Sequence, residues 1–368
     1  MRYQMPLFIA VMVITLFYEL GYKSRAEKRL CVTCVTVVLT LFSGLRTWWY
    51  ADLIKYYTLY THCVGENWRE AVFDKPENIG IRLFFHLAGS LHISYDICLF
   101  VIAAFVAVSL GILIFRYSHS PYMSYLMYIG MGFYLFTFSG LKQSIAMGFL
   151  CFAMICLLEN RWKGWLFWTL VAGVFHAPAL IFVLAYPFSR KQIDRFYFAF
   201  IVILAVVVIV FRNRIANFLA EIYYDEQDAW ETGQGIGGRF LMMAFILVLA
   251  LVLRPLQRDD RQYVYVFNIM VLAALIQSFS VYDNNFTRLA DYYYQFVVLF
   301  IPMMMEDGRV QRLKNPERRH ILYYDSNIYT LLGVCITLFA VWYYRQYSRS
   351  VGDFKFLWEI DPYSLYGR

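Results

Sequence analysis

Charged residues are scarce in this sequence. Only 16% of the 368 residues are Asp, Glu, Lys or Arg, whereas 61% are hydrophobic and 20% are aromatic. A soluble domain of this size cannot keep such a surface in water, so the composition excludes an ordinary soluble enzyme. The net charge is +7, but no basic stretch is interleaved with aromatic residues on a soluble module. We therefore expect no nucleic-acid partner.

Cysteine is almost absent from the polar stretches, and the common metal and nucleophile motifs are missing. Of the seven cysteines only Cys63 lies outside an apolar run, which excludes a disulfide framework. Cys31 and Cys34 have the CxxC spacing, but we interpret them as small residues for helix packing inside a membrane span. There is no HExxH or GxSxG, and the GxGxxG at 233–238 follows an acidic segment rather than a strand. We predict no metal and no cofactor.

Long apolar runs are what the sequence does have. They recur along the chain, and many reach the roughly 18 residues that a helix needs to cross a bilayer. The runs are continuous rather than alternating, which favours helices over a barrel. We predict an all-α polytopic membrane protein with about 11–12 transmembrane or half-spanning helices. The predicted spans lie near 4–20, 28–45, 94–115, 121–138, 141–158, 163–175, 176–188, 196–211, 239–256, 262–281, 286–305 and 322–344.

The short loops that are rich in Lys and Arg predict the orientation of the chain. They belong in the cytoplasm, and one of them is the loop at 306–321. This arrangement puts three polar segments outside: 46–93, with a re-entrant or amphipathic helix at 79–93, then 212–238 and the tail 345–368. No internal repeat or linker is present, so we predict one membrane domain over residues 1–368.

The stretch 163–188 holds a histidine and a proline in an apolar run. Lys163 and Arg190 are both expected in the cytoplasm, yet about 25 residues suffice only for one full span or two half-helices. We favour two half-helices that turn near Gly173 and Pro178, with His176 at the apex; a single kinked span is the alternative. An ionisable residue within a membrane segment is a functional candidate by default. A histidine with a purely structural role is the competing interpretation.

Basic residues recur at the external ends of spans. They are Arg46, Lys142, Arg239 and Arg288. Each one taken singly fits ordinary snorkelling to lipid headgroups. Several together indicate an anion site, because guanidinium groups bind phosphate in a bidentate manner. An anionic, lipid-linked ligand fits this pattern.

Short motifs are spread over nearly the whole chain. They are Arg46 with Asp52 and Tyr56, Glu77 with Gly80, Lys142 with Gln143 and Ala146, Phe175 with His176, and Asn285 with Arg288, Leu289 and Tyr292 or Tyr293. Together they resemble the motifs of the EpsG/Wzy-like polysaccharide polymerases of bacterial cell-surface assembly. Two positions depart from the family pattern. Lys142 replaces an arginine, which keeps the positive charge but loses the guanidinium group that could bind phosphate in a bidentate manner. Pro178 replaces a serine that would have offered His176 a hydroxyl partner.

The resemblance implies a metal-independent glycosyltransferase that polymerises oligosaccharide repeat units carried on undecaprenyl pyrophosphate. It implies a multi-pass protein of the bacterial plasma (inner) membrane whose active site faces the periplasm or exterior, and a chain-length regulator as a candidate protein partner. His176 would be the general base. Arg46, Lys142, Arg239 and Arg288 would neutralise the pyrophosphate leaving group. The sugar and acceptor would contact Asp52, Glu77, Gln143, Asn285 and Tyr292, with Asp52 or Glu77 as alternative bases.

Three other functions remain open from the sequence. A ligase that moves finished glycan needs the same anion site and base. A membrane acyltransferase acting on surface glycans also uses an intramembrane histidine, but its donor would be bound on the cytoplasmic side. A flippase or transporter of lipid-linked oligosaccharide would favour inverted repeats, and none is visible.

Overall fold

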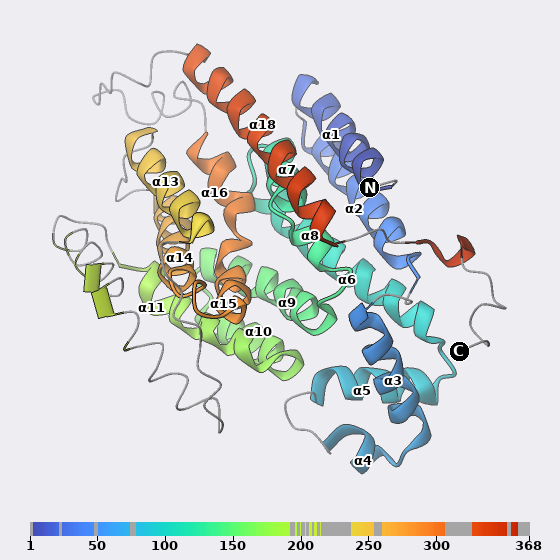
Figure 1. Ribbon diagram of the computed structural model, residues 1–368. Coiled ribbons are helices and arrows are strands. Elements are labelled where there is room, and N and C mark those ends of the chain that lie inside the picture. Colours follow the sequence, from blue (N-terminus) through green and yellow to red (C-terminus); the bar gives the residue numbers. More distant parts are fainter. Residues whose placement is uncertain are drawn as a thin grey trace. The chain divides into compact units, whose positions relative to one another are not determined.

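The computed structural model shows an almost entirely helical chain (Figure 1). It describes residues 3–21, 24–47, 51–73, 79–191, 237–253, 260–305, 326–351 and 355–359, together with isolated positions between 196 and 214. Over this part of the chain the only extended pairing is one antiparallel bridge between Arg46 and Phe356. The predicted all-α membrane architecture is confirmed. Glu77, most of the predicted span at 196–211, most of the loop at 212–238 and the loop at 306–321 lie outside the described residues.

The first two predicted spans are the helices α1 (Gln4–Leu20) and α2 (Arg25–Gly44). A capping box stabilises the first turn of α2. The Ser24 hydroxyl accepts from the Glu27 backbone N–H, and the Glu27 carboxylate accepts from the Ser24 N–H. This reciprocal pair satisfies two donors that a helix end otherwise leaves open. Tyr344 of α18 (Ser326–Val351) packs on α1, where its hydroxyl donates to the Gln4 carbonyl. The helix α18 thus runs seven residues beyond the predicted span end at 344.

Within the described residues, two helices are long and apolar enough to cross a membrane, α6 (Tyr95–Tyr117) and α9 (Leu141–Leu158). At 1.5 Å per residue α6 measures about 34 Å, which matches a bilayer core of about 30 Å. Shorter apolar helices accompany them: Gln4–Leu20, Ile79–Ser90, Ala177–Ser189 and Gly238–Leu253. The helix α6 packs against both α2 and α9, and α9 packs against α10 (Trp162–Phe175).

The predicted span at 121–138 is broken. The helix α7 (Pro121–Gly130) ends, and a short helix α8 (Phe133–Phe136) follows it. Gly132 between them has φ +85°, a left-handed conformation that side chains rarely adopt. A methyl group at Gly132 would also lie 2.9 Å from the Tyr347 ring. The break is therefore built into the sequence at this glycine.

The segment 46–93, whose external position stays a prediction, contains more helix than the sequence predicted. The helix expected at 79–93 is α5 (Ile79–Ser90), but α3 (Ala51–Gly65) and α4 (Trp68–Phe73) precede it and were not predicted. Both pack on α5. Rings from α3, α5 and α6 form one cluster, in which Tyr60 lies 5.7 Å from Phe85 and 5.6 Å from Tyr95. We call α3, α4 and α5 the external helical module, after the predicted position of this segment.

The described residues between 181 and 326 contain a second set of helices. They are α11 (Ala185–Ser189), α13 (Gly238–Leu253), α14 (Arg261–Gln277), α15 (Asn284–Tyr294) and α16 (Val297–Met304). The helix α14 contacts the other four. Its buried Asn268 amide donates to the Ser189 and Lys191 carbonyls at the end of α11, at 2.9 and 3.0 Å. The span predicted at 286–305 is divided between α15 and α16.

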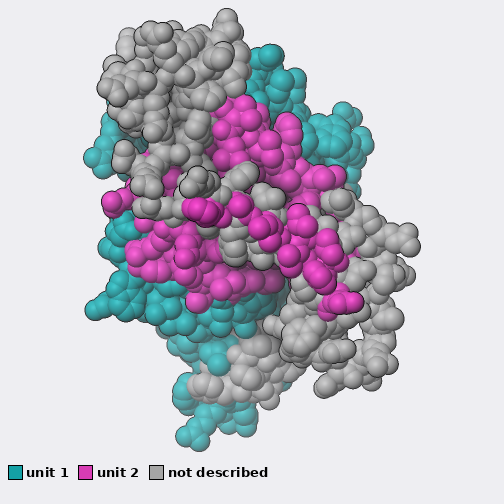
Figure 2. Space-filling view, turned by 90° about the vertical axis from the view of Figure 1, so that its left-hand side faces the viewer, with its two compact units in different colours: residues 1–180, 327–368 teal, residues 181–326 magenta. Residues whose placement is uncertain are grey.

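The helices group into two compact units (Figure 2). Unit 1 comprises residues 1–180 and 327–368, and unit 2 comprises residues 181–326. The first and last parts of the chain thus belong to the same unit. The single membrane domain over 1–368 stays a prediction.

Candidate active site

His176 lies where an apolar helix stops. The helix α10 ends at Phe175, and His176 has extended backbone angles, φ −151° and ψ 102°. Its N–H still donates to the Ala172 carbonyl, and its own carbonyl accepts from the Ala179 N–H, both at 2.9 Å. A 3-10 helix, η2 (Ala177–Leu184), continues the chain. The helix interruption predicted within 163–188 is therefore confirmed, and the choice between two half-helices and one kinked span stays a prediction.

The break bends the chain sharply. A methyl group at Gly173 would lie 2.4 Å from a terminal carbon of Leu180. In a straight α-helix these positions are two turns, about 10.5 Å, apart along the axis. The Leu180 side chain can cover Gly173 only because the helix is interrupted at His176. The histidine is half-buried at this bend.

Arg46 is enclosed by neutral groups of unit 1. Its side chain is buried, and its guanidinium donates to the Ser43 carbonyl, to the Ser43 hydroxyl at 2.7 Å and to the Thr137 carbonyl at 3.1 Å. It also lies over the Phe138 ring, 5.1 Å from the ring centroid. Among the described residues no carboxylate is paired with it, and its Nε has no hydrogen-bond partner. Burial lowers the pKa of Arg46 to about 10, which still leaves it charged at neutral pH.

The C-terminal segment covers Arg46. The Thr47 N–H donates to the Lys355 carbonyl at 2.8 Å, and the Leu357 N–H donates to the Leu45 carbonyl at 3.1 Å. The ring of Phe356, between these bonds, packs on Phe42 at 5.2 Å. This cover leaves the Arg46 side chain facing protein rather than an open site.

Two other predicted residues of unit 1 start α9, and one starts α3. Lys142 is half-buried and Gln143 is buried in the first turn of α9, where free backbone N–H groups and the helix dipole favour an anion. Asp52 lies in the first turn of α3, and its carboxylate is 3.6 Å from the Lys55 ammonium. The Asp52 side chain is 45% exposed, so its carboxylate is accessible from solvent.

Unit 2 brings together a cluster of charges from α13 and α15. Arg239, in the first turn of α13, forms an ion pair with Asp291 of α15 and lies over the Tyr294 ring, 5.1 Å from its centroid. Arg288 is exposed and precedes Asp291 by three residues, so both lie on one face of α15. We call Arg239, Arg288 and Asp291 the charged cluster. It carries one positive charge in excess.

Asp291 is a site candidate that sequence reasoning missed. It lies in the run "ADYYYQ", which reads as an aromatic belt at a membrane interface. The rule that ionisable residues in membrane segments are functional candidates would have selected it, as it selected His176.

The remaining predicted residues of unit 2 divide by exposure. Asp283 caps the start of α15, accepting from the Asn285 N–H at 2.8 Å and from its side-chain amide at 3.0 Å. Asn285 is exposed, whereas Tyr292 is fully buried. Within the described part of the chain no three His, Cys, Asp or Glu side chains gather as metal ligands. Metal independence stays a prediction.

A comparison with known protein families shows which family the chain belongs to. A profile of the EpsG family matches residues 29–355. The chain belongs to the EpsG family. This match confirms the resemblance drawn from the short motifs and supports an exopolysaccharide-type polymerase in general. No curated protein and no solved structure matches the chain.

Proposed function

We propose that this EpsG-family protein lengthens a polysaccharide by joining oligosaccharide repeat units carried on undecaprenyl pyrophosphate. The observation that carries the proposal is a half-buried histidine at the break of an apolar helix in a chain of this family. The reaction takes place on the external face of the bacterial plasma membrane. The bilayer and the lipid-linked oligosaccharide are its partners, and a chain-length regulator is a further candidate.

His176 acts as the general base. The acceptor hydroxyl of the new unit attacks the anomeric carbon at the lipid-linked end of the growing chain. His176 takes the hydroxyl proton, the new glycosidic bond forms, and the bond from the anomeric carbon to the pyrophosphate oxygen breaks. The electron pair of that bond leaves with undecaprenyl pyrophosphate. Histidine suits this step because its ordinary pKa lies near the working pH.

The charged cluster binds the leaving pyrophosphate. Pyrophosphate is already a good leaving group, so its departure requires charge neutralisation more than a proton donor. Arg288 is exposed, and the pairing with Asp291 holds Arg239 in place. Lys142 at the start of α9 is a further candidate for phosphate binding. We assign Arg46 to pyrophosphate only if the segment 355–359 that covers it moves.

Sugar recognition belongs to the exposed polar residues. Asp52 and Asn285 are accessible to an acceptor, and Glu77 is a candidate outside the described residues. Gln143 and Tyr292 are buried, which suits them to support neighbouring residues rather than to contact sugar.

The test uses purified protein in detergent with lipid-linked repeat units, and product length is followed by gel electrophoresis. We expect His176→Asn to lower chain lengthening by about 100-fold or more, the range expected for the loss of a general base. His92→Asn is the matched control. His92 is exposed with φ 55°, a conformation that asparagine tolerates.

The products separate the competing functions. Lengthened chains on the lipid support a polymerase, whereas transfer of whole glycan to another acceptor without lengthening supports a ligase. Movement of substrate across vesicles without new bonds supports a flippase. If His176→Asn lengthens chains as fast as the unsubstituted protein, His176 is not the base.

A further inference from the structure

The first turn of α5 makes an unusually close contact with the last turn of α10. A methyl group at the buried Gly80 would lie 2.8 Å from Phe175 Cγ, 2.9 Å from the Val174 carbonyl oxygen and 3.0 Å from Phe175 Cα. Carbon atoms in favourable contact are about 3.5–4.0 Å apart. Two of the three atoms are backbone and cannot rotate away. Only glycine therefore fits at position 80 with α10 in its present place.

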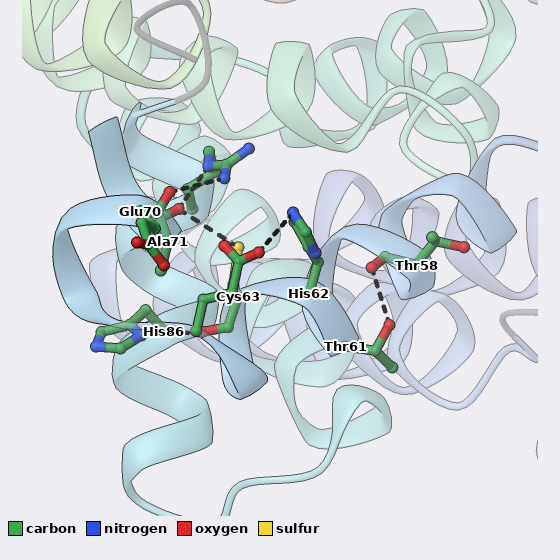
Figure 3. A network of polar contacts seen from close by, with 9 residues as sticks. Thr58, Thr61, His62, Cys63, Glu70, Ala71 and His86 are labelled. Atoms are coloured by element: carbon green, nitrogen blue, oxygen red, sulfur yellow. Dashed lines mark hydrogen bonds and ion pairs between the residues drawn. The ribbon is translucent and has the colours of Figure 1, made fainter. Parts of the chain in front are cut away.

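The helix α5 is itself firmly held in the external helical module (Figure 3). Arg82 is 2% exposed, and its guanidinium donates to the Ala71 and Glu70 carbonyls at the end of α4. The Cys63 thiol points to the same Ala71 carbonyl, and His86 Nδ1 lies 2.9 Å from the Cys63 carbonyl. These bonds tie the ends of α3 and α4 to α5. A shift of α5 at Gly80 would disturb all of them.

The last turn of α10 lies between two supports. Phe175 packs on Phe149 of α9, with ring centroids 5.3 Å apart, and its backbone meets Gly80 of α5. His176 follows directly, at the point where the helical backbone ends. How closely α5 and α9 hold Phe175 therefore constrains where the backbone of His176 lies.

We propose that Gly80 is a positioning residue for His176: it lets the external helical module lie directly against the helix end that presents the histidine. The inference rests on the proposed function of His176 as the base. A displacement of about 1 Å at a reacting group can cost roughly 100-fold in rate. Gly80→Ala forces a shift of several tenths of an ångström, so a smaller loss follows.

The activity test compares Gly80→Ala with Gly65→Ala. Gly65 ends α3 in the same module, and a methyl group there meets nothing within 4 Å. We expect Gly80→Ala to lower kcat by about tenfold with KM nearly unchanged, and to displace the limb of the pH–rate profile that reports the base. Gly65→Ala leaves kcat and the profile unchanged. A loss of folded protein alone would lower the yield and leave the profile of the remaining enzyme in place.

A second readout does not depend on the chemistry of His176. His176→Cys is labelled with a water-soluble maleimide, and its labelling rate is compared with and without Gly80→Ala. We expect the rate to change by at least about threefold. If Gly80→Ala changes the labelling rate but His176→Asn keeps full chain-lengthening activity, then Gly80 does position residue 176. In that case His176 is not the general base, and the proposed function fails separately.

The inference is overturned if Gly80→Ala leaves kcat, the pH profile and the labelling rate as they are, or if Gly65→Ala changes them equally. Should Gly80→Ala not fold, Phe175→Ala tests the contact from the α10 side. It removes Phe175 Cγ, the atom nearest to Gly80. A lowered kcat with a displaced profile supports the inference, and an unchanged profile rejects it.

Discussion

Arg46 and Arg239 both lie at helix ends, yet the fold gives them different surroundings. Arg46 is 2% exposed and is held by neutral oxygens of Ser43 and Thr137. Arg239 is paired with the carboxylate of Asp291, three residues along the helix from the exposed Arg288. The first arginine links the end of α2 to Thr137 within unit 1. The second belongs to a cluster with a second, exposed arginine beside it.

This contrast separates two uses of a guanidinium that look alike in the sequence. A buried guanidinium that donates to carbonyl and hydroxyl oxygens stabilises the fold, because these oxygens would otherwise lose a donor. A guanidinium held by a carboxylate beside a second, exposed arginine leaves excess positive charge for an anion. We therefore expect substitutions at Arg46 to affect folding first and substitutions in the charged cluster to affect turnover first.

Of the substitutions that test this contrast, we expect Arg46→Ala to have the largest effect, and the effect is on stability. The change leaves two buried carbonyls and one hydroxyl without their donor and opens space beneath the segment 355–359. We expect the free energy of unfolding to fall by about 3–5 kcal/mol. Thermal unfolding in detergent measures the loss.

Arg345→Ala is the control for this change. Arg345 is an exposed arginine of α18 in the same unit, and its removal should alter stability by no more than about 0.5 kcal/mol. If Arg46→Ala melts like the unsubstituted protein but no longer lengthens chains, Arg46 is a substrate ligand and the contrast between the two arginines disappears.

We expect the second-largest effect for Arg288→Ala, and this effect is on kcat. Removing an exposed cation that stabilises the departing pyrophosphate should lower kcat by about 100-fold, while the melting temperature stays unchanged. Arg288→Lys keeps the charge without the fork and should recover part of the rate. Arg261 is exposed at the start of α14 in the same unit and serves as the control. We expect Arg261→Ala to leave both kcat and the melting temperature unchanged. A melting temperature that falls with kcat would assign Arg288 to the fold instead.

The sequence predicted the helices better than their interruptions and contacts. The ends of α1 and α9 match the predicted spans at 4–20 and 141–158, because continuous apolar runs bounded by polar residues define a helix directly. The break at Gly132 was missed, since glycine is common in membrane helices and its φ depends on tertiary contact. The helix α3 was missed because its polar residues read as a loop.

For the candidate site, the sequence could indicate which residues are functional candidates but not which partners surround them. His176 stood out because an imidazole and a proline are costly in an apolar run. The burial of Arg46 was not predictable, since its partner Thr137 is 91 residues away and the covering Phe356 is near the other end of the chain. Such pairings come from the packing of distant helices. No local pattern specifies them.

The smallest effect is expected for Asp291→Asn. Asparagine keeps an oxygen that can accept from Arg239 but removes the negative charge, so the pair weakens without leaving its position empty. We expect stability to fall by about 1–2 kcal/mol and kcat by about tenfold, because Arg239 is held less firmly. The donor KM decides the role of the carboxylate. An unchanged KM with a lower kcat means that Asp291 orients Arg239. A lower KM with an undiminished kcat would mean that Asp291 competes with pyrophosphate for Arg239 instead of orienting it. A loss of stability with kcat and KM both unchanged would make the ion pair fold-stabilising, like the contacts of Arg46.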